Sequence, residues 1–427
     1  MTREFLSAPV RDRLRAAWDA DRLHEEFPAV QQEIGGRPLV YLDSAASSLR
    51  PRAVLDVIED FEEHDYSNVH RGVHTLSQRA TLAFETARER VASFVGARHS
   101  EEIVFVRGTT EAINLMAQTH GREVVGEGDE VLVSEMEHHS NLVPWMMLCR
   151  DRGARLVKIP LTESGELDQK AYTAALERGP KIVALAHVSN VLGTQNPLET
   201  MIPAAKAAGA TVVIDGAQAV PHLAVDVAAL GCDAYAFSAH KMYGPSGIGA
   251  LWARRDLLEE MPPWQGGGSM IRSVSFEEVD WNELPYKFEA GTPNITGAVG
   301  FAAAAEFVQT IGVEKLHAHE SRLLEAARSA LAAQHGVCIF GDARERASVV
   351  SFLVEGVHAH DVGQILDQEG VAVRVGHHCA QPIMDFYGVA STTRASFGAY
   401  NRESDVERLI HGVRAVKTFF GMGTATA

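Results

Sequence analysis

Between about residue 100 and residue 255, short apolar runs rich in β-branched residues alternate with segments of helical periodicity. The runs are EIVFV, DEVLVSE, RLVKIPL, KIVALAHV, TVVIDGA, DAYAFSA and GIGALWA. Such alternation is typical of a mainly parallel sheet whose two faces are covered by helices. Ligands of these sheets bind at the carboxyl ends of the strands, so the polar residues that follow each run are the first candidates for chemistry.

The pattern changes in the second half of the chain. Residues 263–296 contain many glycines, prolines and turn signals, which predicts a long functional loop or hairpin. Beyond it, helical segments and the short runs VCIFG, SVVSFLVEG, VAVRV and TTRASFG predict a smaller α+β domain. We therefore expect a large domain at 41–296 and a small C-terminal domain at 297–427, with the N-terminal segment 1–40 packing against the small domain.

Composition narrows the classes of function. Hydrophobic residues make up 46% of the 427 residues and charged residues 22%, close to the globular average. The formal charge of -17, without a Lys/Arg-rich run, argues against nucleic-acid binding. No stretch approaches the roughly 20 apolar residues of a membrane span. The four cysteines form no CxxC pair, so neither disulfides nor a zinc site is expected, and a reducing, cytoplasmic location fits best.

Two charged residues at predicted strand ends are candidates for a site that binds pyridoxal phosphate (PLP) once their chemistry is considered together: Lys241 and Asp215. Lys241 follows the run DAYAF, although taken alone it is explained as well by a surface lysine. Asp215 ends the run TVVID 26 residues earlier (241 − 215), a spacing that suits adjacent strands joined by a crossover. A carboxylate there can pair with the protonated ring nitrogen of PLP, which stabilises a carbanion on a bound amino acid. A capping or turn aspartate is the alternative.

Further candidates lie near these two residues. RGTTEAINL opens a helix with Thr109 and Thr110, whose N–H groups and hydroxyls can bind phosphate, although a plain helix cap is the alternative. Ser238 and His240 can supply the remaining phosphate contacts. His138, in EMEHHSN, lies at another strand end, where its ring can lie flat on a pyridine ring. A structural histidine is the alternative there.

Cys379 is the candidate nucleophile. The segment RVGHHCAQP places it in a polar loop after the predicted strand VAVRV. A buried, inert thiol is the usual state of a cysteine. Here an imidazolium of His377 or His378, or the charge of the cofactor, would favour the thiolate.

Seven segments carry a resemblance to a known family: VIDGAQ, SAHKMYGPSGIG, GTTEAINL, EHHSN, HVSNVLGT, FEAGTPN and RVGHHCAQP. Together they resemble the SUF-type (group II) cysteine desulfurases of the class V aminotransferase fold, over almost the whole chain from about Tyr41. The resemblance implies an α/β, PLP-dependent transferase fold of type I. Its large domain has a mainly parallel seven-stranded sheet, and its smaller α+β C-terminal domain carries the catalytic cysteine.

The resemblance also implies the role of each catalytic candidate. Lys241 matches the lysine that carries PLP, and Cys379 matches the cysteine that receives sulfur as a persulfide. Asp215 matches the partner of the ring nitrogen, Gln218 the contact to the ring hydroxyl, and His138 the stacking imidazole.

The remaining matches concern the phosphate and the substrate. Arg394 matches the arginine that clamps the substrate carboxylate, and Asn190 a residue beside the cofactor and that carboxylate. Thr292 matches a phosphate ligand lent by the second subunit of a homodimer. The other phosphate ligands implied are Thr110, Ser238 and His240.

The activity implied is conversion of L-cysteine to L-alanine with formation of an enzyme persulfide. The family passes this sulfur to an acceptor protein of the SufE or SufU type for iron–sulfur cluster assembly. A selenocysteine lyase, acting on L-selenocysteine, or another class V PLP aminotransferase or lyase is the alternative. A non-enzymatic, PLP-sensing regulator would require an attached DNA-binding domain, which the sequence does not indicate.

Overall fold

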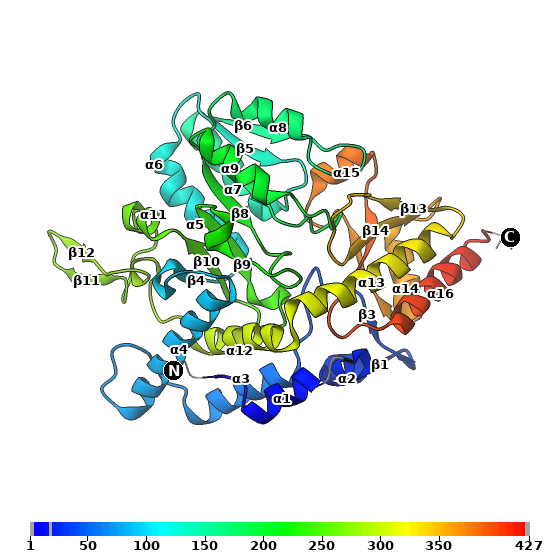
Figure 1. The fold of residues 1–427 in the computed structure, drawn as a ribbon, viewed down its shortest axis with the longest axis horizontal. Helices are drawn as coiled ribbons and strands as arrows, with labels where there is room; N and C mark the ends of the chain where they lie inside the picture. The colour runs from blue at the N-terminus through cyan, green and yellow to red at the C-terminus, as the bar shows by residue number, and fades with distance from the viewer. Residues whose placement is uncertain (1–3, 17–18, 423–427) are drawn as a thin grey trace.

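The computed structural model describes residues 4–16 and 19–422, so the ends of the predicted N-terminal segment and small domain lie outside the described residues. A seven-stranded sheet forms the centre of its larger part (Figure 1). In spatial order its strands are β4 (Ile103–Val106), β10 (Gly249–Ala253), β9 (Ala234–Ser238), β8 (Thr211–Asp215), β7 (Ile182–Ala186), β5 (Glu130–Ser134) and β6 (Arg155–Ile159). All seven apolar runs form these strands. Of the seven, β10 alone runs antiparallel to its neighbours, so the predicted mainly parallel sheet is confirmed.

Helices cover both faces of this sheet. Val131 and Val133 of β5 pack in one apolar cluster, whereas Leu132 packs in another. Because successive side chains of a strand point to opposite faces, the two clusters are the two sides of the sheet. The first cluster draws on α5 (Thr109–Met116), α7 (Val143–Arg152) and α11 (Arg255–Glu260). The second draws on α3 (Arg52–His64), α4 (Thr75–Phe94), α8 (Gln169–Leu176), α9 (Leu198–Ala207) and α12 (Ile295–Ile311).

A smaller antiparallel sheet lies in the C-terminal part. Its strands in order are β13 (Val337–Phe340), β14 (Val349–Val354), β17 (Thr392–Ser396) and β16 (Arg374–Gly376). Apolar residues of this sheet share a core with α13 (Val313–Ala332), α14 (Ala359–Gln368) and α16 (Glu403–Phe419). The short helix α15 (Gln381–Tyr387) follows the loop that carries Cys379.

The N-terminal segment contacts both parts of the molecule. Its helix α1 (Ala8–Ala16) packs on α12, where the Glu306 carboxylate accepts a hydrogen bond from the Phe5 N–H at 2.8 Å. Further along, β3 (Val40–Tyr41) pairs with β15 (Val371–Ala372) of the C-terminal part. Since α12 itself packs against α3 and α4, the division of the chain at residue 296 stays a prediction.

A hairpin of β11 (Ile271–Val274) and β12 (Val279–Trp281) projects from the body of the molecule, at the left of Figure 1. It lies within the segment predicted to be a loop or hairpin. The remaining elements are α2 (Ala20–Glu25), β1 (Glu33–Ile34), β2 (Arg37–Pro38), α6 (Arg122–Val124) and α10 (Val227–Leu230). Among the described residues no single helix is long and apolar enough to cross a membrane. The pair α12 and α13, bent by 77°, passes that test by length and composition only.

Candidate active site

Neighbouring parallel strands end at the candidate site. β8 ends at Asp215 and β9 at Ser238, Lys241 closes the 3₁₀ turn after β9, and His138 follows β5. Because β5, β7, β8 and β9 lie side by side and run in one direction, these residues meet at one edge of the sheet. Lys241 and Asp215 thus come from adjacent strands, as their spacing predicted.

Lys241 is partly buried, and this burial lowers the pKa of its ammonium group to about 8. The carboxylate of Asp215 opposes the shift, whereas the guanidinium groups of Arg394 and Arg374 add to it. A fraction of neutral amine is therefore available near neutral pH. A lysine that bonds to a carbonyl compound requires this neutral form.

The residues expected to hold the pyridine ring are deeply buried. Asp215 is 6% exposed, its Oδ1 accepts a hydrogen bond from the Ala217 N–H at 3.0 Å, and burial raises the pKa of its carboxyl group. Gln218 donates through Nε2 to the Ala45 carbonyl at 2.7 Å, while its buried Oε1 has no hydrogen-bond partner among the described residues. A cationic ring nitrogen and a ring hydroxyl would satisfy these two side chains, so they fit PLP.

His138 is an uncharged ring at this edge. Its Nδ1 accepts a hydrogen bond from the Ser140 N–H at 3.1 Å, which leaves the proton of the neutral ring on Nε2. Burial, followed by the positive charge of Lys241, lowers the pKa of His138 to about 3. A neutral imidazole can stack on a cationic pyridine ring without charge repulsion.

The predicted phosphate ligands other than Thr292 line one cavity of about 520 Å³. Its walls are formed by Arg107, Gly108, Thr109, Thr110, Glu111, Asn114, Ser238, His240 and Trp264. The Thr109 N–H donates to Ser238 Oγ at 2.8 Å, and the two hydroxyl oxygens lie 2.7 Å apart. Burial lowers the pKa of His240 to about 4, so it is a neutral group here. Hydroxyl groups beside the first turn of α5 suit a phosphate group.

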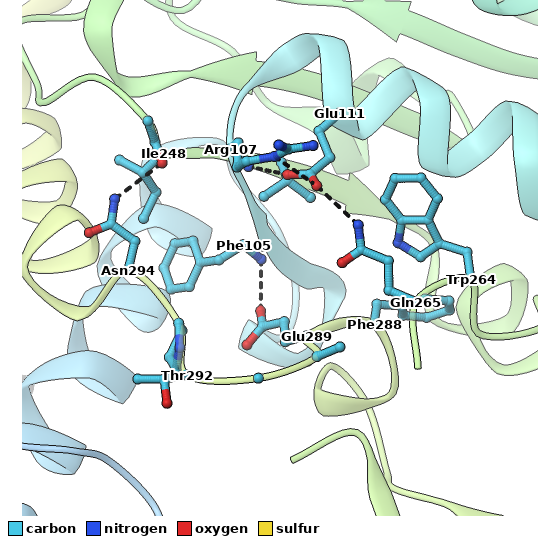
Figure 2. Close-up of a pocket in the computed structure, with 15 residues that line it drawn as sticks. Phe105, Arg107, Glu111, Ile248, Trp264, Gln265, Phe288, Glu289, Thr292 and Asn294 are labelled. Atoms are coloured by element: carbon cyan, nitrogen blue, oxygen red, sulfur yellow. Dashed lines mark hydrogen bonds and ion pairs between the residues drawn. The ribbon is translucent and has the colours of Figure 1, made fainter. Parts of the chain in front are cut away.

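Thr292 lies in a different cavity, of about 400 Å³ (Figure 2). This cavity shares Arg107, Glu111 and Trp264 with the phosphate cavity, and Thr292 lies across it from Glu111. The single chain therefore does not bring Thr292 to its own Ser238. Its role toward a second subunit stays a prediction.

Arg394, on β17, is fully buried. Its Nη1 donates to the Asn190 carbonyl at 2.9 Å and its Nη2 to Asp43 Oδ1 at 3.0 Å, while its Nε has no partner among the described residues. Burial lowers the pKa of Arg394 to about 10, so it remains cationic at neutral pH. Arg374 of β16 is its direct cross-strand neighbour. This arrangement offers a carboxylate two guanidinium groups.

Cys379 is partly buried in the loop between β16 and α15, and its cationic neighbour is not the one expected. Arg374 Nη2 lies 3.4 Å from Cys379 Sγ. The ring of His378 is buried, with Nε2 lying 2.8 Å from Thr392 Oγ1, and burial lowers its pKa to about 2. The prediction of an imidazolium at His378 is therefore wrong, because burial keeps that ring neutral, whereas a charge supplied by His377 or by the cofactor stays a prediction. The cationic group that contacts the thiol is the guanidinium of Arg374.

Two residues at the site, Asp43 and Arg374, were missed by the sequence reasoning, and His139 was placed at a strand end without a role. Asp43 pairs with Arg394 from 351 positions away in the chain. His139 hydrogen-bonds to the Cys379 loop. The arginine in RVGHHC was the one available signal, since a cation shortly before a candidate thiol can stabilise its thiolate.

Residues 40–409 match the family model described as aminotransferase class-V. A cysteine desulfurase of Dickeya dadantii is 50% identical over 402 residues, which cover 94% of this chain and 97% of the relative. A cysteine desulfurase of Pectobacterium atrosepticum is 47% identical over 406 residues, covering 95% and 100%.

Solved structures agree in fold. The cysteine desulfurase CsdA from Escherichia coli superposes with a TM-score of 0.87 at 40% identity, covering 94% of this chain and 99% of that chain. A cysteine desulfurase from Thermococcus onnurineus also gives 0.87, at 39% identity, with 92% and 98% covered.

Proposed function

The chain belongs to the class V aminotransferase family, and we infer that it is a PLP-dependent cysteine desulfurase, which converts L-cysteine to L-alanine and a protein-bound persulfide. The observation that carries this inference is the placement of a thiol and a lysine at one site. Cys379 and Lys241 come from different sheets, yet the His139 N–H, beside His138 at the strand ends of the large sheet, donates to the Cys379 carbonyl at 2.7 Å.

PLP, when bound, withdraws electrons from the Cα of the amino acid attached to it. Lys241 would hold the cofactor covalently, Asp215 its ring nitrogen, and Gln218 its ring hydroxyl. His138 would cover one face of the ring. The phosphate would be held by Thr109, Thr110, Ser238 and His240.

The chain's own residues then bind and convert cysteine. Arg394 holds the substrate carboxylate, with Asn190 beside it. Lys241, whose pKa of about 8 leaves part of the amine neutral, accepts the proton from Cα and can return it.

Sulfur transfer is a displacement at the substrate sulfur by the Cys379 thiolate. A bond forms between Cys379 Sγ and the substrate sulfur, and the bond from that sulfur to Cβ breaks. Its electron pair stays on the carbon side, where a proton completes the methyl group of alanine. The proton of the substrate thiol remains with the transferred sulfur, so the products are alanine and a Cys379 persulfide.

Several finer features belong to the same proposal. We assign the chain to the SUF type, on the motif RVGHHCAQP, and expect a sulfur acceptor of the SufE or SufU type that feeds iron–sulfur cluster assembly. A homodimer would bring Thr292 of one subunit to the phosphate of the other. A reducing cytoplasm suits the four cysteines, which are all unpaired.

Cys379→Ser tests the proposal. The variant should keep PLP, and added cysteine should still change the cofactor absorbance, because the cofactor ligands are intact. Alanine release should fall by orders of magnitude, since a hydroxyl is a far poorer nucleophile toward sulfur than a thiolate. Alanine formed at the wild-type rate would reduce Cys379 to a structural role and make the protein a general PLP lyase. Measuring alanine release by the wild-type protein with and without candidate acceptors would identify the type of its sulfur acceptor.

A further inference from the structure

The loop that carries Cys379 has a strained backbone. His378 and Cys379 have φ values of +52° and +55°. Residues other than glycine adopt this left-handed region rarely, because the Cβ atom crowds the backbone there. Two such residues in succession persist only where the surroundings hold them.

Residues from the segments that follow β5 and β7 of the large sheet hold this loop on both sides of the thiol. The His139 N–H donates to the Cys379 carbonyl at 2.7 Å, and His139 Nε2 accepts from the Gln381 N–H at 3.2 Å. On the other side, Asn190 Nδ2 donates to the His378 carbonyl at 2.8 Å. Gln381 is the first residue of α15, and its N–H has no acceptor within that helix. The imidazole of His139 therefore caps α15.

The protonation of His139 suits this contact. Burial, with the neighbouring ring of His377 at a centroid distance of 5.7 Å, lowers the pKa of His139. The neutral ring can carry its proton on Nδ1 and leave Nε2 as the acceptor. A protonated ring would present an N–H to the Gln381 N–H and lose the contact.

We propose that His139 is a positioning residue for sulfur transfer, which holds the strained Cys379 loop at a fixed distance from the cofactor face that His138 covers. The two histidines are consecutive, so one turn of the chain sets both the stacking ring and the place of the nucleophile. This inference rests on the proposed desulfurase function. His139 acts through Cys379, and its removal should affect the transfer step more than substrate binding.

His139→Ala, compared with His139→Gln and with the exposed His335→Ala as a matched control, tests the proposal in the PLP-loaded protein. Alanine formation gives kcat and KM for cysteine. We expect kcat of the alanine variant to fall about tenfold with KM changed less than about twofold, because misplacing a reacting atom costs rate without loosening the substrate. In His139→Gln, the amide oxygen of the new side chain reaches about as far as Nε2 and should restore most of kcat.

Alkylation of cysteines by iodoacetamide, followed by peptide mass spectrometry, measures how accessible the thiol of the Cys379 loop is and does not require turnover. Cys338 is exposed and lies on β13, so it serves as the internal reference. The ratio of Cys379 to Cys338 alkylation should rise severalfold in His139→Ala and return toward the wild-type value in His139→Gln.

The outcomes separate this inference from the proposed function. If the wild type itself makes no alanine from cysteine, the desulfurase function fails, whereas an unchanged alkylation ratio in His139→Ala overturns the positioning role. A wild-type kcat, or a raised KM with unchanged kcat, in His139→Ala also overturns it. Equal losses in His335→Ala would likewise do so, because they would show that any histidine loss impairs the protein.

Discussion

Replacing Arg394 by lysine keeps a positive charge but removes the planar guanidinium group. In the structure, Nη1 and Nη2 hold the Asn190 carbonyl and Asp43 at 2.9 Å and 3.0 Å. A lysine ammonium is a single donor centre, so it cannot keep both contacts and also make a two-pronged contact with a substrate carboxylate. We expect the loss to fall on cysteine binding.

The size of the effect follows from the lost contact. One hydrogen bond to a charged group contributes about 1.5–3 kcal/mol. Since 1.4 kcal/mol corresponds to a factor of ten, KM for cysteine should rise roughly 10- to 150-fold. PLP content should stay at the wild-type level, because the hydrogen bonds of Asp215, Gln218, Thr109 and Ser238 are made to groups other than Arg394.

The assay is steady-state alanine formation, with PLP content measured by absorbance after release. Arg374→Lys is the matched control, since Arg374 lies opposite Arg394 but contacts Cys379 Sγ. It should lower kcat with a smaller change in KM. An unchanged KM in Arg394→Lys would show that another group holds the carboxylate. If Arg394→Lys lost PLP as well as cysteine binding, Arg394 would be needed to hold the cofactor and not only the substrate.

Two further predictions concern Lys241 and the buried Arg88. The rate at which PLP-free protein captures PLP should rise tenfold per pH unit up to about pH 8 and then level off, because the lowered pKa of Lys241 sets the fraction of neutral amine. The Lys241→Ala variant should capture no PLP covalently. A pH–rate midpoint near 10.5, the ordinary pKa of lysine, would contradict the burial argument. Arg88→Met should lower the free energy of unfolding, measured by urea denaturation, by about 3–5 kcal/mol. Arg88 Nη1 and Nη2 donate to Glu289 Oε1 and Oε2 at 2.6 Å and 2.9 Å, so the variant would leave the Glu289 carboxylate buried without its cation. Adding Glu289→Gln should restore part of the lost stability, and a loss below about 1 kcal/mol would refute the reasoning.

Sequence alone could predict the large sheet and the residues at its strand ends. Each strand is one apolar run, and parallel strands place their carboxyl ends together. Lys241, Asp215 and Ser238 are therefore brought together by local pattern and topology. The four-stranded C-terminal sheet was harder to predict from the sequence, because its strands pair antiparallel in a spatial order that short apolar runs do not specify.

The surroundings of Cys379 depend on contacts between distant segments. Arg374 reaches the thiol because the chain turns sharply after β16, and Arg394 faces Arg374 through the register of β16 and β17. The burial of His378 against Thr392 reverses the charge expected for its ring. Such contacts arise from tertiary packing, which neither residue type nor periodicity encodes.

Because the site is divided between two sheets, its parts are synthesised at different times. Cys379 leaves the ribosome 138 residues after Lys241 (379 − 241), an interval of roughly 7–30 s at about 5–20 residues per second. During that interval the thiol and the arginine on β17 are not yet part of the site. If Cys379 accepts the sulfur as proposed, a chain that ends before the C-terminal sheet cannot take sulfur from cysteine.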